Sequence, residues 1–502
     1  MPTLRVLAVL LAALALAAPA SAQEGELTPV PPPPDTTVDL TEVLRGEGRG
    51  YTADAVAERA LETAPTLDRA RAAVRQAGAG ADRALYGLIP QLNLGFRYTR
   101  LSEIVNQGLV SGDGPMLTPE IIDGLVAGVD DPEAAFNDRV ILEGLAGFSN
   151  FTFPVILDQL SFTGGVAYPL SDAFLSILPA YQGAQENVRA AQHNVDAQRE
   201  AVAFSAREAY YSFARARGAA AVAQISLEQA EARHRQVQAF VAAGTVAPVD
   251  ELRLRAQVAS ARVSVLRAQA GVRVATTALR TLMHLPGDAE IAVAEDVLAP
   301  VPPLDGEIDA LIGRALDQRE DVRALRSLIR ASEYRITAAE GSRYPHLAVA
   351  ANIDLSNPQQ RVFPQTQEFR HSWDVSAIVS WSPHDLLNGE AQASEARALR
   401  DQAEADLRSL EDGIRIQVTD SATSYVAARE ALEASRIGVE AAEESYRVQL
   451  ERYRAGAATL TDLTDAAGEQ ARAQLELVAA ATTARIAAAA LARSLGTGAS
   501  EE

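Results

Sequence analysis

The feature that most constrains this sequence is an internal repeat, because two copies of one structural plan must fold in the same way. Landmark residues of the first half recur in the same order in the second half. Pro90 matches Pro345 at a shift of 255, Asp172 matches Asp385 at 213, and Asp250 matches Asp462 at 212. Three globular domains of about 150 residues each would be the expectation from length alone. The repeat instead predicts two equivalent units, residues 51–286 and 306–497.

The segments outside the two units are predicted to be a leader and connectors. Residues 1–22 combine Arg5, an apolar run and Ala20-Ser21-Ala22, which is the pattern of a secretory signal peptide. The alternative is a membrane anchor, but the apolar run of about 13 residues is shorter than the roughly 20 that a spanning helix needs. The remaining segments are a Pro-rich linker at 23–50, a linker at 287–305 and a tail at 498–502.

The shift between the repeats changes because the first unit carries 42 extra residues. They fall within 102–152, a stretch with Gly, Asp and Asn that predicts a long loop with one short helix at the outer face. No stretch after the leader resembles a transmembrane helix. Any contact with a membrane is therefore expected from strands.

Four segments alternate between apolar and polar residues with a period of two, which is typical of strands with one apolar face. The apolar positions are Leu92, Leu94, Phe96 and Tyr98; Phe162, Gly164, Val166 and Tyr168; Leu347, Val349, Ala351, Ile353 and Leu355; and Trp373, Val375, Ala377, Val379 and Trp381. We expect each unit to contribute two of these strands.

Aromatic residues mark the ends of the predicted strands. Trp373 and Trp381 lie eight positions apart, hence on one face and roughly 26 Å apart along a strand. That spacing suits the aromatic girdles of an outer-membrane barrel, to which we also assign Tyr98, Phe162 and Tyr168. An amphipathic strand of a soluble sandwich would show the same alternation. Since the smallest spanning barrels use about eight strands, a barrel here requires several copies of the chain.

Long helices account for most of the remaining sequence. The stretches from Asp172 to Gly244 and from Asp385 to Gly456 span 72 and 71 positions, and helices of that length reach roughly 105 Å. Apolar residues recur every seven positions, which predicts coiled-coil packing. They are Val188, Val195, Val202, Ala209, Ala216, Ala223, Ala230 and Val237 in the first stretch, and Tyr425, Leu432, Val439, Tyr446 and Tyr453 in the second.

Each long helix is expected to turn back at its glycine and to return antiparallel. The return helices are shorter, about 40 residues, and end near Pro286 and Ser494. A second short helix, 67–89 or 322–343, would stack on each end to match the long partner. The result is a wall of helices rather than a compact bundle.

Composition excludes several classes of function. The chain has 66 acidic and 45 basic residues, all of the latter Arg, and neither Lys nor Cys. Catalytic thiols, disulfides, Schiff-base lysines and P-loop lysines are therefore excluded, and the net charge of −21 disfavours nucleic acid as a partner. The six His residues show no metal-ligand spacing. We expect no cofactor, no bound metal and no enzymatic activity.

Taken together, the repeat resembles the TolC family of outer-membrane efflux ducts over about residues 51–497. The most specific segment is Arg452-Tyr453-Arg454-Ala455-Gly456-Ala457-Ala458-Thr459-Leu460-Thr461-Asp462-Leu463-Thr464-Asp465, which is similar to the family's periplasmic tip. The implied fold is mainly α with a small β part, in which long coiled-coil hairpins accompany four strands per chain. Three chains would form a twelve-stranded outer-membrane β-barrel continued by a periplasmic α-barrel.

The resemblance also implies partners and location. The chain is expected to act as a homotrimer in the outer membrane, in contact with its lipid and with a large periplasmic extension. A periplasmic adaptor (membrane fusion) protein would grip the tips, and an inner-membrane pump of the RND, ABC or MFS type would supply the energy.

The resemblance assigns an aperture to four residues. Asp462 and Asp465 match acidic rings that line the tunnel entrance, and Asp250 and Tyr453 match positions tied into its closing network. Asp462 and Asp465 are three positions apart on one helix face, so a trimer would stack two rings of three carboxylates that select cations. The alternative is that Asp250 and Asp462 complement the N-termini of the return helices, and both interpretations can hold together.

The turns themselves are the predicted adaptor contacts, namely Gly244, Thr245, Val246, Gly456 and Ala457. Glycine is in any case suited to a tight turn, so its presence has two explanations. Ala458 departs from relatives that keep an Arg there as a latch between hairpins, so we expect this latch to be missing or built differently.

Two functions from different classes therefore remain. The preferred one is a passive exit duct of a tripartite efflux or type I secretion system, gated at its periplasmic tip. The alternative is a soluble periplasmic coiled-coil adaptor or scaffold, which explains the hairpins but neither the repeat nor the strands with aromatic ends.

Overall fold

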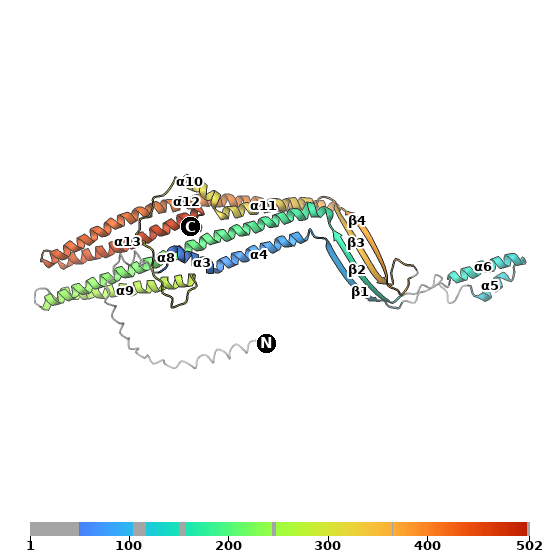
Figure 1. The fold of residues 1–502 in the computed structure, drawn as a ribbon, viewed down its shortest axis with the longest axis horizontal. Coiled ribbons are helices and arrows are strands. Elements are labelled where there is room, and N and C mark those ends of the chain that lie inside the picture. Colours follow the sequence, from blue (N-terminus) through green and yellow to red (C-terminus); the bar gives the residue numbers. More distant parts are fainter. Residues whose placement is uncertain (1–49, 104–116, 150–155, 243–246, 364, 499–502) are drawn as a thin grey trace, which may run out of the picture.

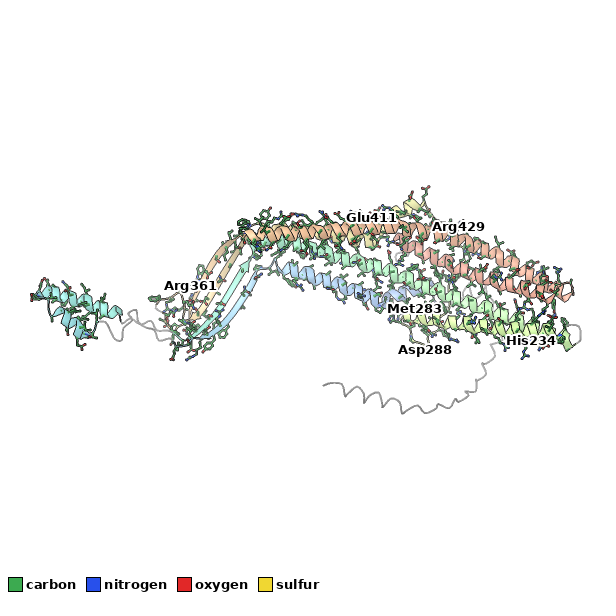
Figure 2. The ribbon with its side chains drawn as sticks, turned by 180° about the vertical axis from the view of Figure 1, so that it is seen from behind. His234, Met283, Asp288, Arg361, Glu411 and Arg429 are labelled. Carbon is green, nitrogen blue, oxygen red and sulfur yellow. The ribbon has the colours of Figure 1, made fainter. Side chains whose placement is uncertain are left out.

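The computed structural model describes residues 50–103, 117–149, 156–242, 247–363 and 365–498. The predicted signal peptide and nearly all of the Pro-rich linker lie outside them. The chain is elongated, with the helical hairpins ending at one end and a small sheet toward the other (Figure 1). Figure 2 shows His234 close to the hairpin ends, Met283 in the middle and Arg361 at the far end of the sheet.

The order of elements is the same in both halves apart from one insertion and two short helical segments that precede the first long helix. The first half contains α3 (Ala53–Thr63), α4 (Pro65–Tyr86), β1 (Gln91–Arg100), α5 (Pro119–Val126), α6 (Pro132–Ser149), β2 (Asp158–Tyr168), α7 (Leu170–Asp172), the π-helix η1 (Ala173–Ile177), α8 (Leu178–Ala242) and α9 (Pro248–Leu282). The second half contains α10 (Ile308–Gln318), α11 (Glu320–Gly341), β3 (His346–Asn357), β4 (Arg370–Ser380), α12 (Pro383–Arg454) and α13 (Leu460–Leu495).

The prediction of one short helix in 102–152 is wrong, because the described part of this segment forms two helices, α5 and α6. Thr118 caps α5 by accepting a hydrogen bond from the backbone N–H of Ile121, and Pro119 follows at the first helical position. Three glycines within the helices weaken the local helical signal. Packing of α5 against α6, which buries Ile122, offsets that cost.

The four strands form one antiparallel sheet in the order β1-β2-β3-β4. Directly opposed residues of such a sheet share a face. The pairing series from Leu94 to Gly164, then to Ile353, then to Trp373 runs across all four strands. This register places every predicted apolar position within the four strands on the same face of the sheet, as a lipid-facing surface requires.

The hairpins pack as predicted. The long helix α8 contacts α9 along one part of its length and α4 along another, and α12 likewise contacts α13 and α11. At the junction, Gly496 after α13 adopts φ 78°, and a Cβ there would lie 3.2 Å from the Cα of Arg319, which precedes α11. Each shorter return helix is thus complemented by a second helix, and α8 joins the halves through α11 and α13.

The principal core lies midway along the rod, where α3, α10 and the segment after α9 cover the long helices. Its largest buried side chains include Tyr210, Phe213, Leu279, Met283, Leu311, Ile414 and Leu432. Polar anchors hold the covering segment in place. The Tyr425 hydroxyl donates to the backbone oxygen of Pro302 at 2.6 Å, and the Tyr211 hydroxyl donates to Glu295 Oε1 at 2.9 Å.

The heptad prediction holds better for α12 than for α8. Tyr425, Leu432 and Val439 of α12 are buried as predicted. In α8 only Ala230 and Val237 of the eight heptad positions are buried, and the others are half-buried. The reason is that α8 contacts several helices on different sides, so its buried surface is wider than one seam and includes Tyr210 and Phe213.

One described helix, α13, is long and apolar enough to cross a membrane by length and composition. This helix differs from the expectation that no stretch after the leader resembles a transmembrane helix. The helix packs against α12 and α8, and many of its apolar residues are alanines buried in that contact, including Ala481, Ala484 and Ala487. Its composition therefore reflects close helix packing in the hairpin.

Candidate functional site

The second hairpin tip is a tight turn built around Gly456. This residue has φ 74°, in the left-handed region that glycine occupies without strain. Its N–H donates to the Tyr453 oxygen at 3.0 Å, and the N–H of Ala457 donates to the Arg452 oxygen at 2.8 Å. The turn therefore requires glycine, and Gly456 and Ala457 both remain exposed. Gly244, Thr245 and Val246, predicted for the first tip, lie outside the described residues.

Asp462 closes a reciprocal cap at the start of α13. The hydroxyl of Thr459 accepts from the Asp462 N–H at 3.2 Å, while Asp462 Oδ2 accepts from the Thr459 N–H at 2.9 Å and its hydroxyl at 2.8 Å. The hydrogen bonds from Thr459, with a smaller contribution from the charge of Arg452, lower the pKa of Asp462. The helix-capping interpretation thus holds for Asp462.

Asp250 occupies the corresponding third position of α9 but makes different contacts. The residue before α9 is Ala247, whose side chain cannot cap the helix. Asp250 Oδ1 instead accepts from Arg253 Nη1 at 3.2 Å, and about a quarter of the Asp250 side chain is exposed. The carboxylate of Asp462 therefore caps its helix, whereas the carboxylate of Asp250 makes no cap and can interact with a neighbouring element.

The structure brings Tyr453, at the end of α12, close to Asp250 at the start of α9. Burial raises the pKa of Tyr453 above its ordinary value, and the negative charge of Asp250 raises it further. No hydrogen bond joins these two side chains among the described residues. The charge of Asp250 thus acts on the phenol of Tyr453 from one hairpin tip to the other, without a direct bond between the two side chains.

Asp465 lies one helical turn after Asp462 on the exposed face of α13. The opposite face, which includes Leu463, Ala466 and Ala467, is buried. The rise of 1.5 Å per residue separates the two carboxylate levels by about 4.5 Å along the helix. This spacing is suited to two stacked rings of negative charge in a symmetric assembly.

A buried contact that the sequence pattern does not predict joins the hairpins above the tip. Arg233 of α8 is buried, its Nη1 donates to the Tyr446 hydroxyl at 3.3 Å, and its guanidinium carbon lies 6.0 Å from the ring centroid. A nearby link joins Gln229 of α8 to Gln470 of α13 at 3.4 Å. The available signal was an Arg between the apolar positions Ala230 and Val237.

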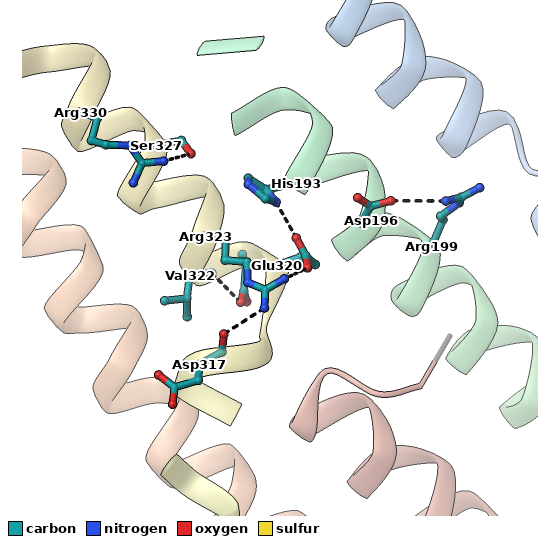
Figure 3. Close-up of polar contacts among 10 residues, drawn as sticks. His193, Asp196, Arg199, Asp317, Glu320, Val322, Arg323, Ser327 and Arg330 are labelled. Carbon is teal, nitrogen blue, oxygen red and sulfur yellow. Dashed lines mark hydrogen bonds and ion pairs between the residues drawn. The ribbon is translucent and has the colours of Figure 1, made fainter. Parts of the chain in front are cut away.

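A second missed cluster lies at the middle of the rod, where α8 faces the start of α11. His193 Nδ1 lies 2.6 Å from Glu320 Oε2, and Arg323 Nη1 donates to Glu320 Oε1 at 2.6 Å (Figure 3). Glu200 lines two neighbouring cavities of about 700 and 550 Å³. Burial is the main cause that raises the pKa of Glu200 to about 7. In the part of the chain that the structure describes, no group of acidic and His residues could hold a metal.

The predicted girdle residues lie toward the two ends of the sheet. At the outer end Phe162 packs on Phe96 with ring centroids 4.8 Å apart, and the Tyr98 hydroxyl donates to Asp158 Oδ1 at 2.8 Å. Tyr168 ends β2 at the opposite end. Trp373 is 71% exposed, whereas Trp381 is 50% exposed, one residue beyond β4. The Trp381 indole N–H donates to the Arg343 backbone oxygen at 3.3 Å.

Comparison with known proteins decides the family. The family model for the outer membrane efflux protein matches residues 56–283 and 311–497, most of the chain. The chain belongs to the outer membrane efflux protein family. As an efflux protein of this kind, it is an outer-membrane exit duct with a large periplasmic helical extension. No curated protein matches the sequence at a significant level.

Solved channels share the fold of this efflux protein at low sequence identity. It is similar to the outer-membrane channel OprN, with 19% identity, a TM-score of 0.68 and coverage of 94% of this chain and 99% of that one. The Campylobacter jejuni CmeC outer membrane channel is 14% identical, with a TM-score of 0.69 and coverage of 91% of this chain and 88% of that one. The open state of the Neisseria gonorrhoeae MtrE outer membrane channel is 17% identical, with a TM-score of 0.66 and coverage of 92% of this chain and 94% of that one.

These findings confirm the predicted family, fold class, exit-duct function and outer-membrane location. At the level of the family they also confirm the homotrimer, the periplasmic adaptor and the inner-membrane pump, since channels of the family act in that form. The alternative of a soluble periplasmic scaffold disagrees with membership of an outer-membrane family.

Proposed function

We propose that this efflux protein is a passive conduit whose periplasmic end closes through Asp250, Tyr453, Asp462 and Asp465. The observation that carries the proposal is their common position at the free ends of the two hairpins, with Asp465 and Asp462 on an exposed face. In a trimer with its axis along the helices, each position occurs three times around the aperture. Rings of carboxylates at a constriction attract cations and disfavour anions.

A hydrogen bond between Asp250 and Tyr453 is proposed to form when the aperture is closed and to hold the two hairpins of one chain together; in the structure the two side chains interact through charge only. The carboxylate of Asp250 is free of a helix cap, and the hydroxyl of Tyr453 is partly shielded from water. An adaptor that separates the hairpins would break a phenol–carboxylate contact and no covalent bond. Opening would then require differential binding energy only.

The positive charge that relatives place at position 458 is proposed to come from Arg452. Its Nη2 donates to the Ala457 oxygen at 3.4 Å, and its charge contributes to the low pKa of Asp462. The exposed residues Gly456 and Ala457, together with Gly244, Thr245 and Val246, are proposed to contact the adaptor. The apolar sheet face, bounded by Tyr98, Phe162, Tyr168, Trp373 and Trp381, is proposed to face outer-membrane lipid.

The conduit is further proposed to carry out no covalent chemistry. The family is one of transport channels, and the sequence contains neither Cys nor Lys. The energy for export would come from the inner-membrane partner.

Conductance in planar bilayers tests the aperture. The purified trimer of the double variant Asp462→Asn, Asp465→Asn is compared with the parent protein in monovalent salt and after addition of a multivalent cation. We expect at least a tenfold weaker block and a lower preference for cations. Glu440→Gln, which removes one exposed negative charge elsewhere in α12, is the control. Equal block in all three proteins would contradict the carboxylate rings.

A further inference from the structure

The helical insertion between β1 and β2 has no equivalent in the second half, where residues 358–369 join β3 to β4. Helices α5 and α6 form a hairpin of their own, beyond the end of the sheet that lies away from the long helices (Figure 1). Arg139 of α6 bonds Asp123 of α5 at 2.5 Å and Glu143 at 3.0 Å. The hairpin is thus a defined structural unit at the outer mouth of the proposed barrel.

The hairpin exposes more apolar surface than its own fold can cover. Three pairs of side chains at a spacing of four residues are between 46% and 66% exposed, namely Ile121 with Leu125, Phe136 with Val140, and Ile141 with Leu145. Soluble proteins rarely leave large apolar patches in water. Something therefore covers these pairs when the protein is assembled.

The directions of the pairs indicate more than one covering surface. At 100° per residue, the Phe136 pair and the Ile141 pair of α6 point about 140° apart around the helix axis. A flat surface such as a membrane covers one side of a helix and leaves the opposite side in water. A closed ring of identical subunits instead places a neighbour on each side of every copy, through two different contact surfaces.

The charge of the hairpin also argues against a lipid surface. Residues 117–149 contain seven acidic side chains and one basic side chain, Arg139. Interfacial helices that bind phosphate-bearing lipids carry Lys and Arg on their polar face. Neighbouring copies need no such attraction, because the barrel already holds them together.

The connecting segments are long enough for three hairpins to meet. Eight residues separate α6 from β2, and eighteen separate β1 from α5. Eight extended residues reach up to about 28 Å, whereas twelve strands spaced about 4.8 Å apart enclose a barrel radius of about 12 Å. Three copies tethered at one mouth have an effective concentration in the millimolar range.

We propose that the three α5–α6 hairpins of the trimer pack on one another over the outer mouth of the barrel, through their exposed apolar pairs. The partner of this surface is thus a second and a third copy of the same chain. The proposal rests on the trimer of the proposed function, so the test reports assembly separately from hairpin packing.

The absence of Cys from the sequence allows single thiols to be introduced into a thiol-free protein. Val140→Cys and Leu145→Cys place thiols about 140° apart around α6, and Asn137→Cys places one at the exposed polar position between these two directions as the matched control. Each full-length variant is labelled with a bulky maleimide in intact outer membranes and after purification. It is also treated with a flexible bismaleimide and examined on denaturing gels.

We expect the Val140 and Leu145 thiols to react at least tenfold more slowly than the Asn137 thiol in both settings, and to form links between chains. Equal labelling at all three sites in an intact trimer would overturn the hairpin proposal alone. Protection that is lost on purification, without links between chains, would assign the surface to lipid or another protein and also overturn it. A monomer by size-exclusion chromatography with light scattering would overturn the trimer as well.

Discussion

The two hairpin tips place an aspartate at the same point of equivalent helices, yet the two aspartates make different bonds. Asp462 is held by the backbone and hydroxyl of Thr459, whereas Asp250 has an alanine, Ala247, at its N-cap, accepts a hydrogen bond from Arg253 and acts on Tyr453 only through its charge. One side chain at the N-cap decides the difference, because alanine offers no hydroxyl to complete the cap. The bonds that hold the aspartate of the second tip therefore all come from the turn itself, whereas the aspartate of the first tip has no such cap.

Removing Arg233 should have the largest effect, because this buried side chain joins the two hairpins above their tips. Arg233→Ala deletes a charged hydrogen bond to Tyr446 and leaves a void, at a cost of about 2–3 kcal/mol in local stability. Hydrogen exchange of the purified protein should accelerate more than 20-fold at 229–240 and 442–453. The exposed Arg235→Ala serves as control. If both variants exchange alike, the tips do not depend on this contact.

Thr459→Ala makes the second tip resemble the first. Loss of the cap should cost about 1 kcal/mol, so amides at the start of α13 should exchange about fivefold faster. The variant should also raise the pKa of Asp462, measured by carboxyl NMR, because the bond from the Thr459 hydroxyl is lost. Thr461→Ala, an exposed change two residues later, should leave the pKa unaltered.

The sign of the associated pH dependence follows from the lowered pKa of Asp462. A carboxyl whose pKa is lower in the folded state contributes stability above its ordinary pKa and loses it as the pH falls through the lowered value. The start of α13 should therefore open below about pH 4 in the parent protein. A tip that opens equally at pH 3 and pH 6 would contradict the cap.

Ala247→Thr makes the reverse change and should have a smaller effect. A hydroxyl at position 247 can accept from the N–H of Asp250 and draw its carboxylate into a cap, with a gain of up to about 1 kcal/mol for the start of α9. Slower exchange at 248–254 and a more open channel in bilayers are expected, because Asp250 then no longer faces Tyr453. Ala247→Ser, a second cap-forming change, should reproduce both results. If the helix start is stabilised but gating is unaltered, the contacts of Asp250 do not control the aperture.

Asp250→Asn should produce the smallest effect. Burial is the main cause of the raised pKa of Tyr453, and the charge of Asp250 adds to it. Removing that charge should lower the pKa of Tyr453, which stays above its ordinary value because burial persists, as measured by NMR of labelled tyrosine. Because a raised tyrosine pKa contributes stability that is lost as the pH rises through it, the tip contact should weaken at slightly lower alkaline pH in the variant. An unchanged pKa would place the carboxylate too far away to act.

Prediction from sequence succeeds where a pattern is local and repeated. The alternation in 92–98 and 373–381 identifies β1 and β4 to within a few residues. It fails in 102–152, where glycines conceal α5 and α6, whose stability comes from packing on each other. It also fails for the α8 seam, since a helix with neighbours on several sides buries more than one stripe.

In the candidate site, too, the positions of residues follow from the sequence, whereas their long-range contacts do not. The positions of Asp250, Asp462 and Gly456 follow from the repeat, and the φ of Gly456 agrees with the turn. The partner of Arg233, however, lies 213 residues away in the other hairpin. The pair of Tyr453 and Asp250 likewise depends on how two separate hairpins are placed side by side.

By itself the sequence determined the two-fold plan, the lengths of the helices and the alternating strands, because periodicity and turn residues act over neighbouring positions. Tertiary structure alone decided which carboxylate caps a helix and which faces a tyrosine, which arginine is buried, and that the insertion is a helical hairpin with uncovered apolar sides. These features depend on contacts between segments far apart in the chain. Burial and partner charge at such contacts are set by packing, and no local pattern encodes them.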